Sequence, residues 1–196
     1  MLSFGKKVNY RPLLVSLSLA FIIGLLFKIN LSLRSGIEIG TIVFLLVFLG
    51  HYLLILPIIF NYWDSQKENI RYSDNKTIRT RLAVMFYPRH LRLKEIAKND
   101  IVAITLLGLP QKSSNPRNDP TVSEETGLLY NLTLLINQPI KIRLTLRNKT
   151  VVDLDLSNDY VNRPEKTLGK LNIFLNSFNP QLIHLTTETR EFLHSK

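Results

Sequence analysis

Three groups of polar side chains in this sequence are of types that could do chemistry. Three carboxylates, Asp153, Asp155 and Asp159, lie close together in the chain and suggest a metal site. His51 stands inside a long apolar run, where an imidazole can move protons. Lysines and arginines crowd residues 67–98 and suggest an anionic partner. The chain has no cysteine, which excludes disulfides, thiolate nucleophiles and zinc–thiolate sites.

The carboxylates also fit a role in a β-strand. Asp153 and Asp155 alternate with apolar residues, so we expect both to lie on the solvent face of a strand. There Asp155 would face Arg143, and Asp153 would face Thr145, on the neighbouring strand. The remaining histidines have no companion at ligand spacing: His90, His184 and His194. Without a glycine-rich phosphate loop or a nucleophile elbow, the sequence predicts no enzyme, no cofactor and no metal.

The cationic segment holds most of the positive charge. Its nine lysines and arginines, set against three acidic residues, account for +6 of the formal net charge of +10. We expect a basic face that binds an anionic membrane surface or a protein partner, at about 1 kcal/mol per cation near a bilayer. That face is formed by Lys76, Arg79, Arg81, Arg89, Arg92 and Lys94. The alternative is that these charges only fix the orientation in the membrane. Nucleic acid is not an expected partner, because a stacking platform needs exposed rings and Phe86 belongs to a buried set.

Two apolar runs precede the cationic segment and must hold it at a membrane. Pro12–Phe27 and Ile39–Phe60 contain no Asp, Glu, Lys or Arg. A helix needs roughly 20 apolar residues to cross a hydrocarbon core about 30 Å thick. We therefore predict a membrane α-helical hairpin within residues 1–63, with spans at about 12–29 and 39–60. A cleaved signal peptide is the alternative for the first run, but residues 27–30 lack the small side chains of a cleavage site.

The cations that flank the two spans predict the orientation. Three cations precede the first span and four follow the second within residues 67–79, whereas the link holds only Lys28 and Arg34. Positive flanks stay in the cytoplasm, so we expect a multi-pass protein of the plasma membrane with both termini cytoplasmic. Tyr10 and the pair Tyr62–Trp63 would lie at the same interface as an aromatic belt.

His51 is the strongly polar side chain of the second run and lies near its middle. A neutral imidazole in hydrocarbon needs a hydrogen-bond partner, and Ser16 or Ser18 on the first span could supply it. We expect a structural bond between the two helices. The alternative is proton transfer or gating, which requires several hairpins to assemble around a pore.

Beyond Trp63 the apolar residues recur with a period of two, which predicts a cytoplasmic β domain over residues 64–196. The expected strands cover residues 80–87, 101–107, 130–136, 140–146 and 152–156. Residues 110–126 contain three prolines and predict a mobile loop. Turns of three residues would place Ile136 opposite Ile140 and Leu146 opposite Val152.

The last expected element is a helix over residues 163–178. Asn162 and Glu165 resemble a capping box, and Pro164 suits the first turn of a helix. One apolar stripe follows, formed by Leu168, Leu171, Leu175 and Phe178. About seven strands and this helix predict a half-open barrel or bent sandwich whose open end the helix closes.

A resemblance to bacterial pleckstrin-homology-like domains rests on three stretches, Arg71–Ile78, Leu91–Leu93 and Asp100–Ile104. It implies a mainly-β, PH-like fold of about seven strands plus a C-terminal helix. The whole chain resembles the EbsA-like family of Gram-positive bacteria in its length, its paired spans and its exit at Tyr62–Asp64. This second resemblance implies a role in the cell envelope, and members of that family carry a pore-forming label.

These observations predict a non-enzymatic integral membrane protein whose cytoplasmic β domain binds an anionic membrane surface or a protein partner. The alternative function is an oligomeric pore, built from several copies of the chain with His51 in the lumen. Ion leakage through such a pore would change as the pH crosses the imidazole range at about 6.5.

Overall fold

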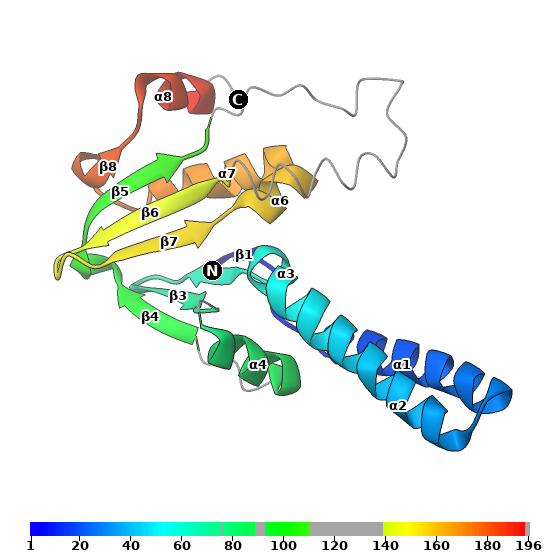
Figure 1. The fold of residues 1–196 in the computed structure, drawn as a ribbon. Coiled ribbons are helices and arrows are strands. Elements are labelled where there is room, and N and C mark those ends of the chain that lie inside the picture. The colour runs from blue at the N-terminus through cyan, green and yellow to red at the C-terminus, as the bar shows by residue number, and fades with distance from the viewer. Residues whose placement is uncertain (76, 89–92, 110–138, 195–196) are drawn as a thin grey trace, which may run out of the picture. The chain divides into compact units, whose positions relative to one another are not determined.

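The computed structural model describes residues 1–75, 77–88, 93–109 and 139–194 and divides into two compact units (Figure 1). The β unit consists of Met1–Gly5, Tyr62–Tyr72 and Lys94–Lys196, and the hairpin unit consists of Lys6–Asn61 and Ser73–Leu93. The predicted boundary lay at residue 63. The structure differs because a short N-terminal strand joins the β unit and residues 73–93 join the hairpin.

The hairpin unit contains two helices that are long and apolar enough to cross a membrane. The first is α1, Arg11–Asn30, and the second runs without a break over Leu33–Ile59. The second helix comprises α2 (Leu33–Leu45), a π-helical segment η1 (Leu46–Tyr52) and α3 (Leu53–Ile59). It begins before the predicted residue 39 because Ser32 caps it, its hydroxyl accepting from the Ser35 amide at 3.2 Å.

Large apolar side chains cover the outside of this hairpin. Only 22% of the apolar window in the first helix and 11% in the second is buried inside the structure. A core helix of a soluble protein would instead be mostly buried. The low burial therefore favours a hairpin whose outer surface lies in lipid.

Glycines bring the two helices into backbone contact. A Cβ atom at Gly36 would lie 2.6 Å from the Gly24 carbonyl oxygen, and one at Gly24 would lie 2.8 Å from the Gly36 carbonyl oxygen. At Gly40 the added atom would meet the Ala20 carbonyl oxygen at 3.1 Å. Gly36 and Gly40 form a small-xxx-small pair, which is how membrane helices pack when lipid offers no hydrophobic driving force.

The strand predicted at residues 80–87 is wrong, because these residues form the helix α4, Ile78–Phe86. Thr77 caps α4, its hydroxyl accepting from the Thr80 amide at 3.2 Å. Val84 and Met85 are buried in a cluster with residues of the hairpin, including Phe48 and Leu56. Alternation over so short a run also fits one face of a helix, and packing against the hairpin selects the helix.

The β unit contains two four-stranded sheets among its described residues, so a mainly-β region is confirmed. The first sheet has the order β1 (Leu2–Gly5), β2 (Tyr62–Ser65), β3 (Asn69–Ser73) and β4 (Leu93–Ala97). The second has the order β7 (Val151–Asp155), β6 (Lys141–Leu146), β5 (Ile101–Leu107) and β8 (Ile183–His184). The predicted loop 110–126 and the strand at 130–136, including Ile136, lie outside the described residues.

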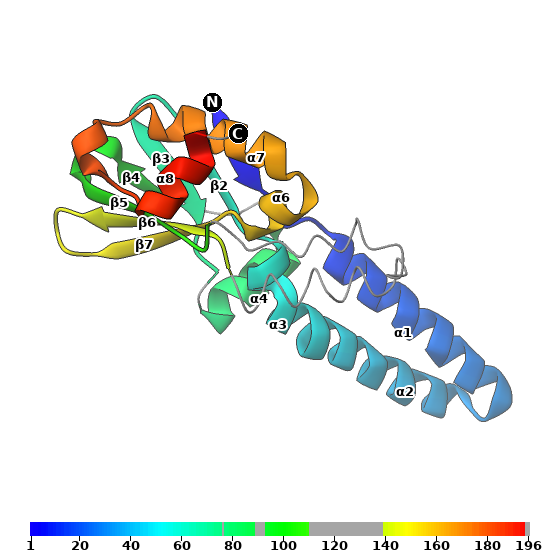
Figure 2. The ribbon, with the colours of Figure 1, turned by 90° about the horizontal axis from the view of Figure 1, so that it is seen from above.

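Among its described residues, the β unit has the helices α6 (Ser157–Asn162), α7 (Pro164–Leu175) and α8 (Thr187–His194), with short 3-10 turns at Lys98–Asp100 and Pro180–Leu182 (Figure 2). Pro164 opens α7 as predicted, and Leu168, Leu171 and Leu175 are buried. The predicted capping box is wrong, because Asn162 ends α6 and its amide donates to the Asn158 carbonyl at 2.6 Å. Phe178, beyond the end of α7, packs against the core.

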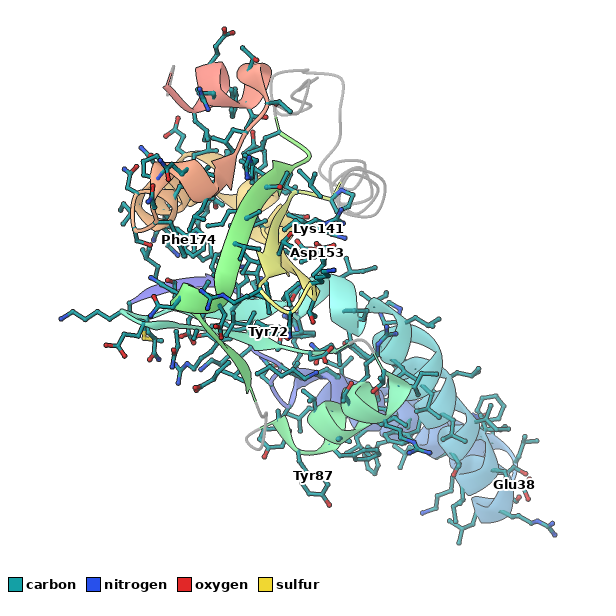
Figure 3. All side chains as sticks on the ribbon, turned by 90° about the vertical axis from the view of Figure 1, so that its left-hand side faces the viewer. Glu38, Tyr72, Tyr87, Lys141, Asp153 and Phe174 are labelled. Atoms are coloured by element: carbon teal, nitrogen blue, oxygen red, sulfur yellow. The ribbon has the colours of Figure 1, made fainter. Side chains whose placement is uncertain are left out.

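Trp63 is the centre of the β-unit core and is fully buried. Its ring stacks on Phe4 at 4.1 Å between centroids and meets Phe174 edge-on at 5.3 Å. The indole N–H donates to the Asp155 carbonyl oxygen at 3.0 Å. Phe174, which reaches the core from α7 (Figure 3), was missing from the predicted stripe.

The predicted register of β6 and β7 is wrong by two residues. Val152 pairs with Leu144 rather than Leu146, and Asp153 pairs with Arg143 rather than Thr145. The loop covers residues 147–149, and Lys149 adopts a left-handed φ of 64° there. A shift of two residues keeps every side chain on its face, so the alternation alone does not distinguish the two registers.

Candidate membrane-binding site

The predicted basic face is divided between the two units. Arg79 and Arg81 lie on α4 in the hairpin unit, whereas Lys94 lies on β4 in the β unit. Three of its residues lie outside the described part of the chain: Lys76, Arg89 and Arg92. Arg79 and Lys94 are exposed, but Arg81 is half-buried. The sequence predicted one basic face on the β domain. The structure instead places Arg79 and Arg81 in the hairpin unit.

Arg81 is turned inward by a proline in the second span. Pro57 has no backbone N–H, so the Leu53 carbonyl lacks its helical donor. The Arg81 guanidinium supplies one, with Nη1 at 3.4 Å from the Leu53 oxygen, and its Nε donates to the Asn75 carbonyl at 2.8 Å. Arg81 is thus a structural donor, and the signal that could have revealed it is a proline inside an apolar span.

Asn75 extends this arrangement to the end of the span. Its side-chain amide donates to the Phe60 carbonyl oxygen at 2.9 Å, directly after α3. The C-terminal end of a helix carries unpaired carbonyls and partial negative charge, which amides and cations stabilise. Asn75 and Arg81 together fasten residues 73–88 to the hairpin.

Exposed cations gather at the terminal end of the hairpin, where the chain enters and leaves it. Those in the described part of the chain are Lys6, Lys7, Arg11 and Arg79. At the opposite end, the tip, Arg34 is paired with Glu38 at 2.8 Å, which leaves Lys28 as the other cation (Figure 3). The charge asymmetry predicted from the flanks is therefore present at the two ends of one packed unit.

The polar residues predicted inside the membrane are not joined in the structure. His51 lies 18 residues after Leu33, about 27 Å along a helix of 27 residues, so it lies past the midpoint, in the half of the helix that leads to the terminal end. Its ring is exposed and meets Tyr52 edge-on at 5.1 Å. Ser16 is buried and donates to the Pro12 carbonyl of its own helix at 2.7 Å, and Ser18 is exposed. Within the described hairpin residues, the proposed bond from His51 to a serine is not formed.

Each of the three suggested metal-binding carboxylates has its own partner. Asp153 accepts two hydrogen bonds from Arg143, at 2.8 and 3.1 Å, and this contact raises the pKa of the arginine. Asp155 faces Lys141 rather than Arg143 and accepts from the Ser157 amide at 2.7 Å. Asp159 accepts from the amide of Gly5 at 2.8 Å. Among the described residues, no three His, Cys, Asp or Glu side chains are grouped to hold a metal.

A buried carboxylate on β2 was missed by the sequence interpretation. Asp64 is fully buried and accepts from the Tyr62 hydroxyl and from Arg71 Nε and Nη2, each at 3.0 Å. Burial, followed by the bond to Asp64, raises the pKa of Tyr62. The bond to Asp64 likewise raises the pKa of Arg71. A buried charge with three donors is compensated, and the cluster links β2 to β3.

Comparisons with protein-family models, with curated proteins and with solved structures find no match. Function is therefore inferred from the exposure, charge and contacts of the residues described above.

Proposed function

We propose that this chain is a non-enzymatic integral membrane protein that binds anionic lipid headgroups at the terminal end of its hairpin. The observation that carries the proposal is the cluster of four exposed cations at that end, Lys6, Lys7, Arg11 and Arg79, opposite an ion-paired tip. Each cation near an anionic surface contributes about 1 kcal/mol. The apolar outer surface of both helices supports insertion.

The pairing of β1 with β2 supports a hairpin whose two ends lie on one side of the membrane. Gly5 pairs with Tyr62, and these two residues directly flank the hairpin segment. Both helices therefore start from neighbouring positions of one sheet. We propose that this side is the cytoplasm, because the cations gather there and positive flanks are retained.

Cysteine labelling tests this topology, since the chain has no native cysteine. In intact cells, Ser195→Cys is expected to be protected from an impermeant maleimide, and Ser35→Cys at the tip is expected to react. Moving the cationic end outward would cost about 2.3 kcal/mol per charge per 100 mV of potential. Ser35 is the better tip position because Ser32 caps α2. Labelling at Ser195 in intact cells, with Ser35 protected, would contradict the orientation.

Lipid retention tests the proposed binding. We expect the full chain to retain phosphatidylglycerol over phosphatidylcholine in native mass spectrometry, and Lys6→Gln, Arg11→Gln and Arg79→Gln together to remove most of that preference. At about 1 kcal/mol per cation, the triple change corresponds to a loss of roughly 100-fold in relative affinity. The preference should also weaken as salt is raised, because exposed charges are screened.

The matched control for lipid retention is Arg34→Gln at the tip. Arg34 is equally exposed but already paired with Glu38, so its loss should leave the preference nearly unchanged. Equal retention of both lipids by the unaltered chain at low salt would refute lipid binding and leave a protein partner as the default. The full chain is required, because a 64–196 fragment lacks β1 and removes the hairpin that packs α4.

We also propose that the β unit is a PH-like domain in which the first sheet is completed by a strand from before the hairpin. Two four-stranded sheets with α7 against a shared core support this proposal. The parallel pairing of β8 with β5 is an addition to the predicted meander. The EbsA-like resemblance and the pore with His51 in its lumen stay predictions.

A further inference from the structure

The geometry points to α4 as a membrane-interface helix, which lays an apolar stripe into the lipid beside the second span. This inference rests on the hairpin being inserted in a bilayer, as proposed above, but not on the binding of anionic lipids. It assigns to the exposed apolar side chains of α4 a contact with hydrocarbon and headgroups rather than with water or a further protein.

The stripe is defined by residues four apart on α4. Ile78 and Phe86 are exposed to 62% and 45%, and Leu82 between them is half-buried. Residues at i, i+4 and i+8 lie on one face of a helix. Val84 and Met85 are buried against the hairpin. Met85 lies three residues after Leu82 and seven after Ile78, so the buried face directly borders the stripe. The helix is therefore held along one edge of its apolar surface, while Ile78 and Phe86 stay exposed.

Contacts with the second span fix how α4 lies along the hairpin. Arg81 reaches the Leu53 carbonyl, and the Phe86 ring lies 4.9 Å from the Phe48 ring. Moving from Arg81 to Phe86 thus follows the span from Leu53 to Phe48, about 7 Å toward the tip. Phe86 is the deeper end of the stripe, and Ile78 is the shallower end.

The position of Phe48 along the hairpin shows where the border of the hydrocarbon core lies. Phe48 packs in one cluster with Leu13, in the first turn of α1, where the charge-free run begins. The second helix has 27 residues, about 40 Å, and exceeds a hydrocarbon core of about 30 Å, so its last turns extend beyond that core. Helix α4 packs against this border, where α1 enters the lipid.

Lipid is the occupant that the surroundings of the stripe favour. Phe86 packs on the buried Phe48 ring of the span and is itself 45% exposed, so it adds apolar surface to the outside of the hairpin. Arg79 is exposed on the same helix, and Tyr87, directly after it, points away from the ribbon (Figure 3). An interfacial helix carries this combination, with apolar side chains in the acyl border and a cation and an aromatic ring at the headgroups.

Site-directed spin labelling of the full chain in lipid nanodiscs tests the inference. Ile78→Cys, Phe86→Cys, Leu25→Cys and Ile173→Cys are each labelled with a nitroxide, and collisions with oxygen and with a water-soluble nickel chelate are measured. Leu25 reports a lipid-facing position of α1. Ile173 is the matched control, an isoleucine on α7 of the β unit that is exposed to 60%.

We expect the oxygen-to-nickel collision ratio to be several-fold higher at Phe86 than at Ile173, with Ile78 in between. A ratio at Phe86 equal to that at Ile173 would mean that the stripe faces water and would overturn the inference. Low collision with both reagents at Phe86 would mean that protein covers the stripe and would overturn it as well. A low ratio at Leu25 would refute membrane insertion itself, so the two failures are distinguishable.

Discussion

Replacing Gly36 with leucine is expected to separate the two hairpin helices and destabilise the hairpin unit. A Cβ atom at this position would lie 2.6 Å from the Gly24 carbonyl oxygen, which is backbone and cannot rotate away. Overpacking alone costs about 1–3 kcal/mol, and here the close packing of both helices is also lost, so we expect about 3 kcal/mol or more. Pulsed electron resonance between labels at Leu17 and Phe44 should show a longer and broader distance.

Gly50 provides the matched control for this change. It lies in the same continuous helix, but a Cβ atom there would have no neighbour within 4 Å. Gly50→Leu should therefore leave the distance between Leu17 and Phe44 unaltered. An unchanged distance in Gly36→Leu would contradict close glycine packing, and a change in both variants would point to a general effect of leucine.

The second large effect is expected from Trp63→Ala in the β unit. The change removes the contacts with Phe4 and Phe174 and leaves the half-buried Asp155 carbonyl without its indole donor. Truncating a buried tryptophan costs about 3–5 kcal/mol. Hydrogen exchange in residues 141–155 should accelerate by about two to three orders of magnitude, at 1.4 kcal/mol for each factor of ten.

Two controls accompany the exchange measurement. Trp63→Phe keeps the aromatic contacts and loses only the N–H donor, so it should cost about 1 kcal/mol. Ile173→Ala, beside Phe174 but exposed, should have little effect. If residues 141–155 exchange at the original rate in Trp63→Ala, Trp63 is not the centre of that core.

Composition and alternation were sufficient to predict the two long apolar helices, the strands β5, β6 and β7, and the start of α7 at Pro164. These elements carry their signal within one short stretch, either as an unbroken apolar run or as a period of two. The glycine pair in α2 was also readable, because a small-xxx-small spacing inside a span is a local pattern. It was not used in the prediction.

The remaining features depend on residues far apart in the chain. Residues 78–86 alternate like a strand, but their packing against Phe48 and Leu56 makes them a helix. The register of β6 and β7 depends on the loop at residues 147–149, in which Lys149 adopts a left-handed φ. Alternation does not specify where this loop lies. Arg81 left the basic face because it satisfies a carbonyl that Pro57, 24 residues earlier, leaves unpaired.

With the hairpin inserted in a membrane, as proposed above, the pairing of β1 with β2 makes the order of folding a consequence of insertion. The four residues of β1 are synthesised before the hairpin, and their partners follow only after Asn61. Closing a flexible loop of this length costs about 3–4 kcal/mol of chain entropy beyond a constant term. Once inserted, the antiparallel helices hold the two loop ends together, so that most of this entropy is already lost when the sheet forms. The proposed insertion would thus act as the nucleating step for the first sheet, and slow insertion would delay folding of the whole β unit.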